Sequence, residues 1–183
     1  MKERILDVAA EKINSYGLKK FTVDEIAAEL KISKKTIYKY FKSKDDMILQ
    51  YFEAIISSDK ESVEKTLRSN SEFLEKIHQI VYSNHKYKLP IKLLNEAKLF
   101  YPEEWNEIEK LKKYKLNVIK KLLEEAALEG KINSEVNLSV LSKMLEKISD
   151  TFVDYDFLIG NKLKTTEAID EAFKIILYGI LNK

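Results

Sequence analysis

Apolar side chains recur at helical spacing along almost the whole chain. Near the N-terminus Ile5, Val8, Ala9 and Ile13 share one face of a helix over about residues 2–16, and the same three- and four-residue spacing returns in the later segments. Only four glycines and two prolines interrupt the 183 residues, which is too little punctuation for many short strands. The pattern predicts an all-α protein of about nine helices and no strands.

The first 46 residues carry the signals of three short helices joined by tight turns. Gly17 stands where a C-terminal cap belongs, and Thr22 with Glu25 forms a capping box in which each side chain satisfies a free amide at a helix start. Ser33 can cap the next helix, expected over 34–41. Two short helices joined by a turn and preceded by a packing helix are a helix-turn-helix, whose second helix lies in the DNA major groove.

Positive charge is concentrated on this second helix and its flanks. Six lysines and no acidic residue fall between positions 31 and 44: Lys31, Lys34, Lys35, Lys39, Lys42 and Lys44. Because Ile37 and Phe41 are four residues apart, both must face the preceding helices, and the lysines and hydroxyl groups then face outward. Lysines neutralise phosphates or donate to guanine, and hydroxyl groups bond phosphates, so the outward face is suited to DNA.

The predicted DNA contacts are the cationic and hydroxyl side chains on and beside this face. They are Thr22, Ser33, Lys34, Lys35, Thr36, Tyr38, Lys39, Tyr40 and Lys44. Two alternatives stay open at this point. Charge runs are often only solvated surface, and Tyr38 and Tyr40 could be packing residues.

The run from Phe21 to Ile48 resembles the TetR family of transcriptional regulators. Its most telling pieces are Ser33-Lys34, Thr36-Ile37-Tyr38 and Tyr40-Phe41-Lys42-Ser43-Lys44, with Gly17-Leu18 ahead of Phe21-Thr22. The resemblance implies that Thr22, Lys34, Lys35, Thr36, Tyr38, Tyr40 and Lys44 contact operator DNA.

The sequence departs from the family pattern at two positions. Lys31 and Lys35 stand where glycine is frequent, so Lys31 is strained if the turn is left-handed, and Lys35 adds a long cation to the reading face. These departures make the operator sequence unpredictable by analogy.

From Met47 onward the apolar stripes lengthen into a larger helical body. We therefore expect a helix-turn-helix DNA-binding domain over 1–46 and an effector-binding and dimerisation domain over 47–183. Expected body helices begin at Ser43, near Asn70, after Pro90 and at Pro102, and two more cover about 137–159 and 166–181.

The C-terminal helix is apolar nearly all round in its last turns, which indicates burial on every side. By resemblance to the family, this helix and the one before it form a four-helix interface with their symmetry mates in a homodimer. The predicted interface residues are Leu141, Met144, Ile148, Ile169, Ala172, Phe173, Ile176, Gly179 and Ile180. A purely intramolecular core is the alternative.

The resemblance also implies an effector pocket inside the body, for an apolar or aromatic small molecule and without a bound cofactor. Its candidate lining residues are aromatic: Phe73, Tyr82, Phe100, Tyr101, Trp105, Tyr114, Phe152 and Tyr155. Aromatic residues at helical spacing usually pack, so each of them has a core role as its alternative.

Several classes of function lack support. The absence of cysteine excludes disulfides and thiolate chemistry, and His78 and His85 are too far apart for a helical metal pair. No glycine-rich phosphate loop is present, and no apolar run is long enough for a membrane span, so we expect a cytoplasmic protein that is not an enzyme.

The sequence therefore predicts a ligand-responsive repressor that binds a palindromic operator as a homodimer. Two alternatives are an enzyme with a glutamate–tyrosine site hidden in the body, and a helical scaffold that binds another protein through its C-terminal helices.

Overall fold

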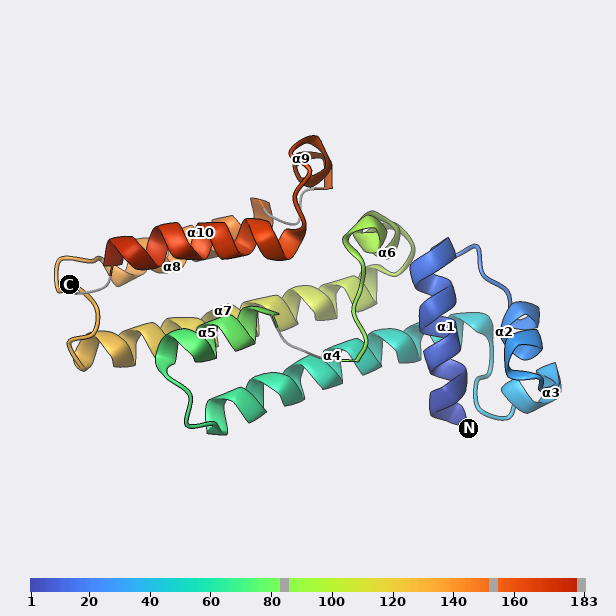
Figure 1. Ribbon diagram of the computed structural model, residues 1–183. Coiled ribbons are helices and arrows are strands. Elements are labelled where there is room, and N and C mark those ends of the chain that lie inside the picture. Colours follow the sequence, from blue (N-terminus) through green and yellow to red (C-terminus); the bar gives the residue numbers. More distant parts are fainter. Residues whose placement is uncertain (83–85, 152–154, 181–183) are drawn as a thin grey trace. The chain divides into compact units, whose positions relative to one another are not determined.

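The computed structural model describes residues 1–82, 86–151 and 155–180, and these residues form helices and no β-strand (Figure 1). The prediction of an all-α protein is confirmed. The elements in chain order are α1 (Lys2–Tyr16), α2 (Val23–Leu30), α3 (Lys34–Ile37), α4 (Lys44–Arg68), α5 (Phe73–Tyr82), the 3-10 helix η1 (Ile91–Leu93), α6 (Leu94–Phe100), α7 (Pro102–Leu128), α8 (Leu138–Thr151), α9 (Tyr155–Gly160) and α10 (Thr165–Ile180).

Two elements differ from the prediction. The α-helical part of α3 ends at Ile37, whereas the sequence pattern extends to Phe41. The chain beyond Ile37 tightens, because Tyr40 donates to the Ile37 carbonyl at 2.9 Å, three residues back rather than four. The predicted helix over 137–159 corresponds to α8 and α9, which lie on either side of residues 152–154.

The chain packs as two compact units. One comprises Met1–Glu61 and His85–Glu109, and the other comprises Ser62–Asn84 and Lys110–Lys183. The helices α4 and α7 each continue from one unit into the other. These packing units have other bounds than the predicted domains 1–46 and 47–183, and the roles assigned to those domains stay predictions.

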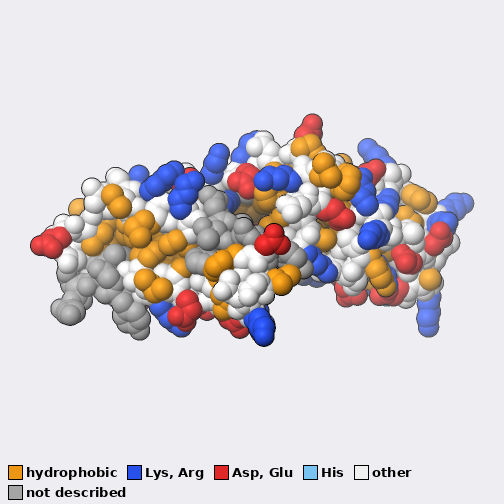
Figure 2. All heavy atoms as spheres, turned by 90° about the horizontal axis from the view of Figure 1, so that it is seen from above, with side chains coloured by type: hydrophobic (Ala, Val, Ile, Leu, Met, Phe, Trp, Pro, Cys, Tyr) orange, Lys and Arg blue, Asp and Glu red, His pale blue; other side chains and the backbone are white. Residues whose placement is uncertain are grey.

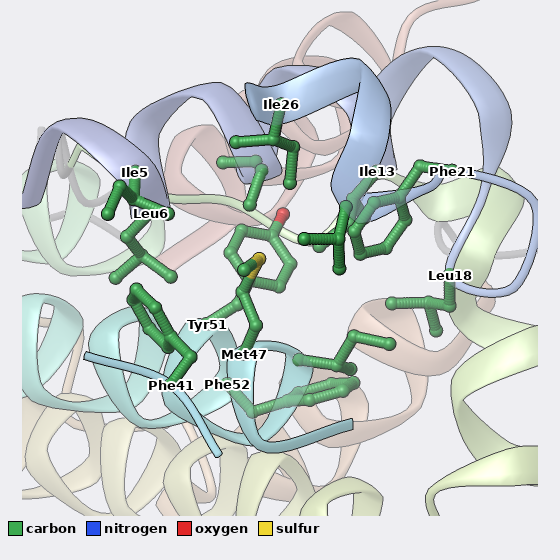
Figure 3. Packing of buried hydrophobic residues seen from close by; sticks show 14 of the residues in the cluster. Ile5, Leu6, Ile13, Leu18, Phe21, Ile26, Phe41, Met47, Tyr51 and Phe52 are labelled. Carbon is green, nitrogen blue, oxygen red and sulfur yellow. The ribbon is translucent and has the colours of Figure 1, made fainter. Parts of the chain in front are cut away.

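The core of the first unit joins the N-terminal helices to the first half of α4. Tyr51 and Met47 point from α4 toward side chains that include Ile5, Ile13 and Ile26 (Figure 3), and all five are fully buried. Burying apolar side chains of this size is the main force that holds such helices together. The start of α4 is thus fixed to the helices that precede it.

The loop after α1 is held by a charged group from α6. The Leu18 amide donates to Glu96 Oε2 at 2.6 Å, and Gly17 beside it has φ +94°, a conformation that side chains disfavour. A Cβ atom at Gly17 would lie 2.9 Å from the same carboxylate oxygen. Glycine is therefore required here both for the backbone conformation and for the approach of Glu96.

We expect Gly17→Ala to lower the free energy of unfolding by about 1–3 kcal/mol, the usual strain of such a backbone conformation in a residue other than glycine. Urea denaturation followed by circular dichroism would measure it. Gly160→Ala is the matched control, because a Cβ atom there meets nothing within 4 Å. Equal stability of the Gly17 and Gly160 variants would contradict this prediction.

The core of the second unit includes residues that the sequence assigned to a dimer interface. Leu141, Ala172 and Ile176 are 4%, 8% and 8% exposed within the single chain. They have little surface left for a partner within the single chain, and their assignment to the interface stays a prediction. Helical spacing shows that a face is apolar, but not whether its neighbour belongs to the same chain.

Other apolar side chains on these helices remain accessible. Val140, Met144 and Ile175 are 56%, 49% and 74% exposed, and orange side chains appear over α8 and α10 at the left of Figure 2. Ile148, Ile169 and Phe173 are half-buried, whereas the side chains of Gly179 and Ile180 lie outside the described residues. Of the predicted interface residues whose side chains are described, Met144 is the exposed one.

Candidate DNA-contact surface

The start of α2 is built by its capping box. The Thr22 hydroxyl accepts a hydrogen bond from the Glu25 amide at 3.2 Å, and Glu25 Oε2 accepts one from the Thr22 amide at 2.7 Å. The bond from the Thr22 amide is the main reason that the pKa of Glu25 lies below its usual value. Because the Thr22 amide is used within the chain, it is not free to hold a DNA phosphate.

A left-handed residue makes the turn between α2 and α3. Lys31 has φ 54° and ψ 43°, so the lysine at this position adopts the conformation for which glycine is favoured. Ser33 then caps α3 by accepting a hydrogen bond from the Thr36 amide at 3.2 Å. The sequence therefore produces two short helices at a fixed angle, as the helix-turn-helix arrangement requires.

The side chains after the turn separate into an inner and an outer face. Ile37 and Phe41 are 0% and 1% exposed, whereas Tyr38 and Tyr40 are 50% and 41% exposed. Lys and Arg side chains, in blue, stand out where α2 and α3 lie, at the right of Figure 2. The exposure of the two tyrosines favours an outward role over a packing role.

Five of the predicted contact residues already have partners within the chain. Thr22 bonds Glu25, and the hydroxyl groups of Ser33 and Thr36 lie 3.0 Å apart. Lys34 Nζ lies 2.7 Å from Asp24 Oδ1. Lys44, the fifth, is engaged on its buried side.

Lys44 stabilises the loop between α1 and α2. Its Nζ donates to the Lys19 carbonyl oxygen at 2.6 Å and lies 4.4 Å from the centroid of the Phe21 ring. Partial burial lowers the pKa of Lys44 from its ordinary value. Its first role is thus structural, and a phosphate contact by the same ammonium stays a prediction.

The side chains of the remaining four predicted contacts make no hydrogen bond or ion pair with any residue that the structure describes. They are Lys35, Tyr38, Lys39 and Tyr40, all exposed. Binding DNA through these side chains would therefore break no hydrogen bond or ion pair within the described chain. The sequence pattern did not separate these four from the five engaged residues.

A polar cluster at the start of α4 was not found from the sequence. The Tyr101 hydroxyl donates to Asp45 Oδ1 at 2.8 Å, and Lys19 Nζ lies 3.8 Å from the same Asp45 oxygen and 4.7 Å from the Tyr101 ring centroid. Tyr101 is 6% exposed and belongs to the first unit's core, and its assignment to an effector pocket stays a prediction. Tyr101 and Asp45 are 56 positions apart, and no local sequence signal links them.

The other proposed pocket residues are distributed over both packing units. Trp105 packs against the first unit's core and Phe73 against the second unit's core, while Phe100 and Tyr114 are 46% and 36% exposed. Tyr82 is half-buried. Phe152 and the side chain of Tyr155 lie outside the described residues.

A surface hollow of about 490 Å³ is lined by residues of α8 and its N-terminal flank, among them Val140, Lys143 and Met144.

Over the parts of the chain described, no three potential metal ligands of the His, Cys, Asp or Glu type come together. His78 pairs with Asp170 at 3.4 Å, and His85 lies outside the described residues. None of the described helices is long and apolar enough to span a membrane.

Residues 5–51, which include the whole of the surface described above, match the family of bacterial regulatory proteins named for TetR. This segment is a TetR-family helix-turn-helix. The chain that carries it is a DNA-binding transcriptional regulator rather than an enzyme.

Full-length relatives agree with this assignment. The chain is 26% identical over 184 residues to an uncharacterised HTH-type transcriptional regulator, YvaF, of Bacillus subtilis (strain 168), covering 98% of this chain and 95% of the relative. It is 24% identical over 188 residues to the fatty acid metabolism regulator protein of the same organism, with the same two coverages. Both relatives extend the similarity beyond the helix-turn-helix.

Solved structures of other regulators show the same fold at low sequence identity. A putative transcriptional regulator from Saccharomonospora viridis in complex with choline superposes with a TM-score of 0.76 at 16% identity, over 100% of this chain and 98% of that one. The fatty acid degradation regulator FadR from Bacillus halodurans gives a TM-score of 0.63 at 21% identity, over 96% and 94%.

Proposed function

We propose that this TetR-family protein is a ligand-responsive repressor that binds a palindromic operator as a homodimer. The observation that carries the proposal is the outer face with Lys35, Tyr38, Lys39 and Tyr40, whose side chains form no hydrogen bond or ion pair with a described residue. One such face makes few contacts with DNA. Two faces related by twofold symmetry bind two half-sites about one helical turn, or a multiple of it, apart.

The accessible apolar side chains of α8 and α10 support a dimer. Val140 and Met144 share one face of α8, and Ile175 is 74% exposed on α10. Covering these side chains with a second copy would remove apolar surface from water.

We expect Met144→Glu to weaken this dimer at least tenfold, because a carboxylate would lose its hydration in the interface. Sedimentation equilibrium measures the change in dissociation constant. Leu128→Glu is the matched control, since Leu128 is also apolar but lies on α7 and is 90% exposed. An unchanged dissociation constant for the Met144 variant would place the interface elsewhere.

The continuity of α4 offers a route for ligand control. Its residues up to Glu61 belong to the first unit and those from Ser62 to the second. Tyr51 and Phe52 lie in the first unit's core, and Val63 lies in the second's. A ligand bound by the body can change DNA affinity only if it binds the DNA-bound and free conformations with different affinity.

The effector that we propose is an apolar or amphipathic small molecule. One relative is named as a fatty acid metabolism regulator, and one structural neighbour is named as a complex with choline. We take a long-chain fatty acid as the first probe and choline, a small hydrophilic cation, as its chemical counterpart.

The test is selection of duplexes from a random DNA pool by the full chain, followed by anisotropy with each probe. We expect inverted half-sites, two chains per duplex in sedimentation, and release by at least one probe. A reporter placed behind the selected duplex should be less active when the protein is present. Asymmetric selected sites, or higher reporter activity, would contradict the proposal.

A further inference from the structure

Asp24 places a negative charge beside the start of α3, the second helix of the helix-turn-helix. It lies in the first turn of α2, and its Oδ1 is 2.7 Å from Nζ of Lys34, the first residue of α3. Within the described chain, Lys34 is the one lysine of positions 31–44 that forms an ion pair. Positions 31–44 contain no acidic residue, but the fold places the Asp24 carboxylate beside one of their lysines.

This ion pair contributes little to folding. The side chains of Lys34 and Asp24 are 53% and 67% exposed, so water and salt screen their attraction. The capping box of Thr22 and Glu25 already stabilises the start of α2, and Ser33 already caps α3. Neither helix depends on the Lys34–Asp24 pair for its termini.

The pair has a larger consequence for binding a polyanion. A lysine that neutralises a phosphate releases counterions, and each such contact steepens the dependence of log affinity on log salt concentration by about 0.9. The Asp24 carboxylate, 2.7 Å from Lys34 Nζ, compensates the charge of Lys34 and competes with phosphate for its ammonium. Lys35 and Lys39 have no such competitor among the described residues.

We propose that Asp24 limits the affinity of the helix-turn-helix for DNA by keeping Lys34 out of contact with phosphate. Asp24 is thus an affinity-setting residue that acts through Lys34, and it leaves DNA contact to the partner-free side chains. This inference rests on DNA binding by the helix-turn-helix and is independent of ligand response or operator symmetry.

The experiment measures the affinity of the full chain for a random-sequence duplex over a range of salt concentrations by fluorescence anisotropy. For Asp24→Asn we expect a salt dependence steeper by about 0.9, which corresponds to about fivefold to tenfold tighter binding near 0.1 M salt. Thermal unfolding of the variant should match that of the wild type, because asparagine keeps the shape of the side chain.

A second substitution separates the proposed mechanism from a simple change in net charge. Lys34→Met should leave the salt dependence of the wild type unchanged and should remove the gain of Asp24→Asn. Glu53→Gln is the matched control, because it removes one exposed negative charge well along α4 and should leave the salt dependence unchanged.

Two results would overturn the proposal. One is a salt dependence in Asp24→Asn equal to that of the wild type. The other is a gain of the same size when Lys34 is already methionine, which would mean that Asp24 repels DNA directly. Asymmetric operators or an absent ligand response would contradict the proposed repressor mechanism. Neither result would change the salt dependences expected for the Asp24 and Lys34 variants.

Discussion

Replacing both Tyr38 and Lys39 with alanine is expected to weaken binding to the selected operator by about a hundredfold or more, with no change in melting temperature. A good contact to a base edge contributes about 1–3 kcal/mol, and two such contacts are lost. Both side chains are exposed and make no hydrogen bond or ion pair with a described residue. Their removal therefore leaves the core and the caps of α2 and α3 intact.

Anisotropy with the full chain at several salt concentrations would measure this loss. The matched control is the double variant Lys113→Ala, Tyr114→Ala, an adjacent lysine and tyrosine on α7 that are also exposed. If the control loses as much affinity as the Tyr38, Lys39 variant, the loss comes from the change in net charge or aromatic content. Such a result would mean that the outer face with Tyr38 and Lys39 does not contact the operator.

Local rules predicted the framework of this surface. The capping box needs only Thr22 and Glu25, three residues apart, and the inward direction of Ile37 and Phe41 follows from their spacing. The structure has both features, with Ile37 and Phe41 almost completely buried. Interactions within one turn of helix can be inferred from sequence because the chain itself fixes the distance between the groups.

Interactions across turns and between distant segments could not be inferred in this way. Asp24 reaches Lys34 across the turn between two helices, and Glu96 reaches the Leu18 amide from 78 positions away. Such contacts depend on the angle at which helices pack, which apolar spacing does not encode. The sequence therefore located the surface but did not show which of its lysines is already paired.

The same limit applies to the predicted interface residues of the second unit. Leu141 and Met144 are three residues apart on α8 and both apolar, so a helical wheel places them on one face. Leu141 is 4% exposed and Met144 is 49% exposed. One stripe thus contains side chains that pack inside the chain beside others that remain available to a partner.

Tyr51→Ala is expected to lower the free energy of unfolding by about 3–5 kcal/mol, as for other large aromatic residues removed from a core. Tyr51 is 0% exposed, and its ring lies edge-on to those of Phe52 and Tyr87, each with a centroid distance of 6.2 Å. Its hydroxyl donates to the Lys88 carbonyl oxygen at 2.6 Å. Urea denaturation of the full chain would measure the loss.

Tyr51→Phe separates the hydroxyl from the ring. It keeps the packing but leaves the Lys88 carbonyl without its donor, so we expect a smaller loss of about 1–3 kcal/mol. Equal losses for the alanine and phenylalanine variants would mean that the ring itself contributes little. Such a result would contradict the role assigned to Tyr51 in joining α4 to α1 and to the segment that contains Lys88.

The two Tyr51 proteins should also differ at high pH. Burial raises the pKa of Tyr51 above the value of about 10 that it has in an unfolded chain. Its contribution to stability is therefore complete below pH 10 and is lost as the pH rises toward the folded-state pKa, because the unfolded chain ionises first. Tyr51→Phe has no such group at this position, so between pH 10 and 12 it should lose less stability than the wild type. Parallel losses would indicate that the Tyr51 hydroxyl reaches water in the folded protein, and that apolar contact alone joins Tyr51 to the segment that contains Lys88.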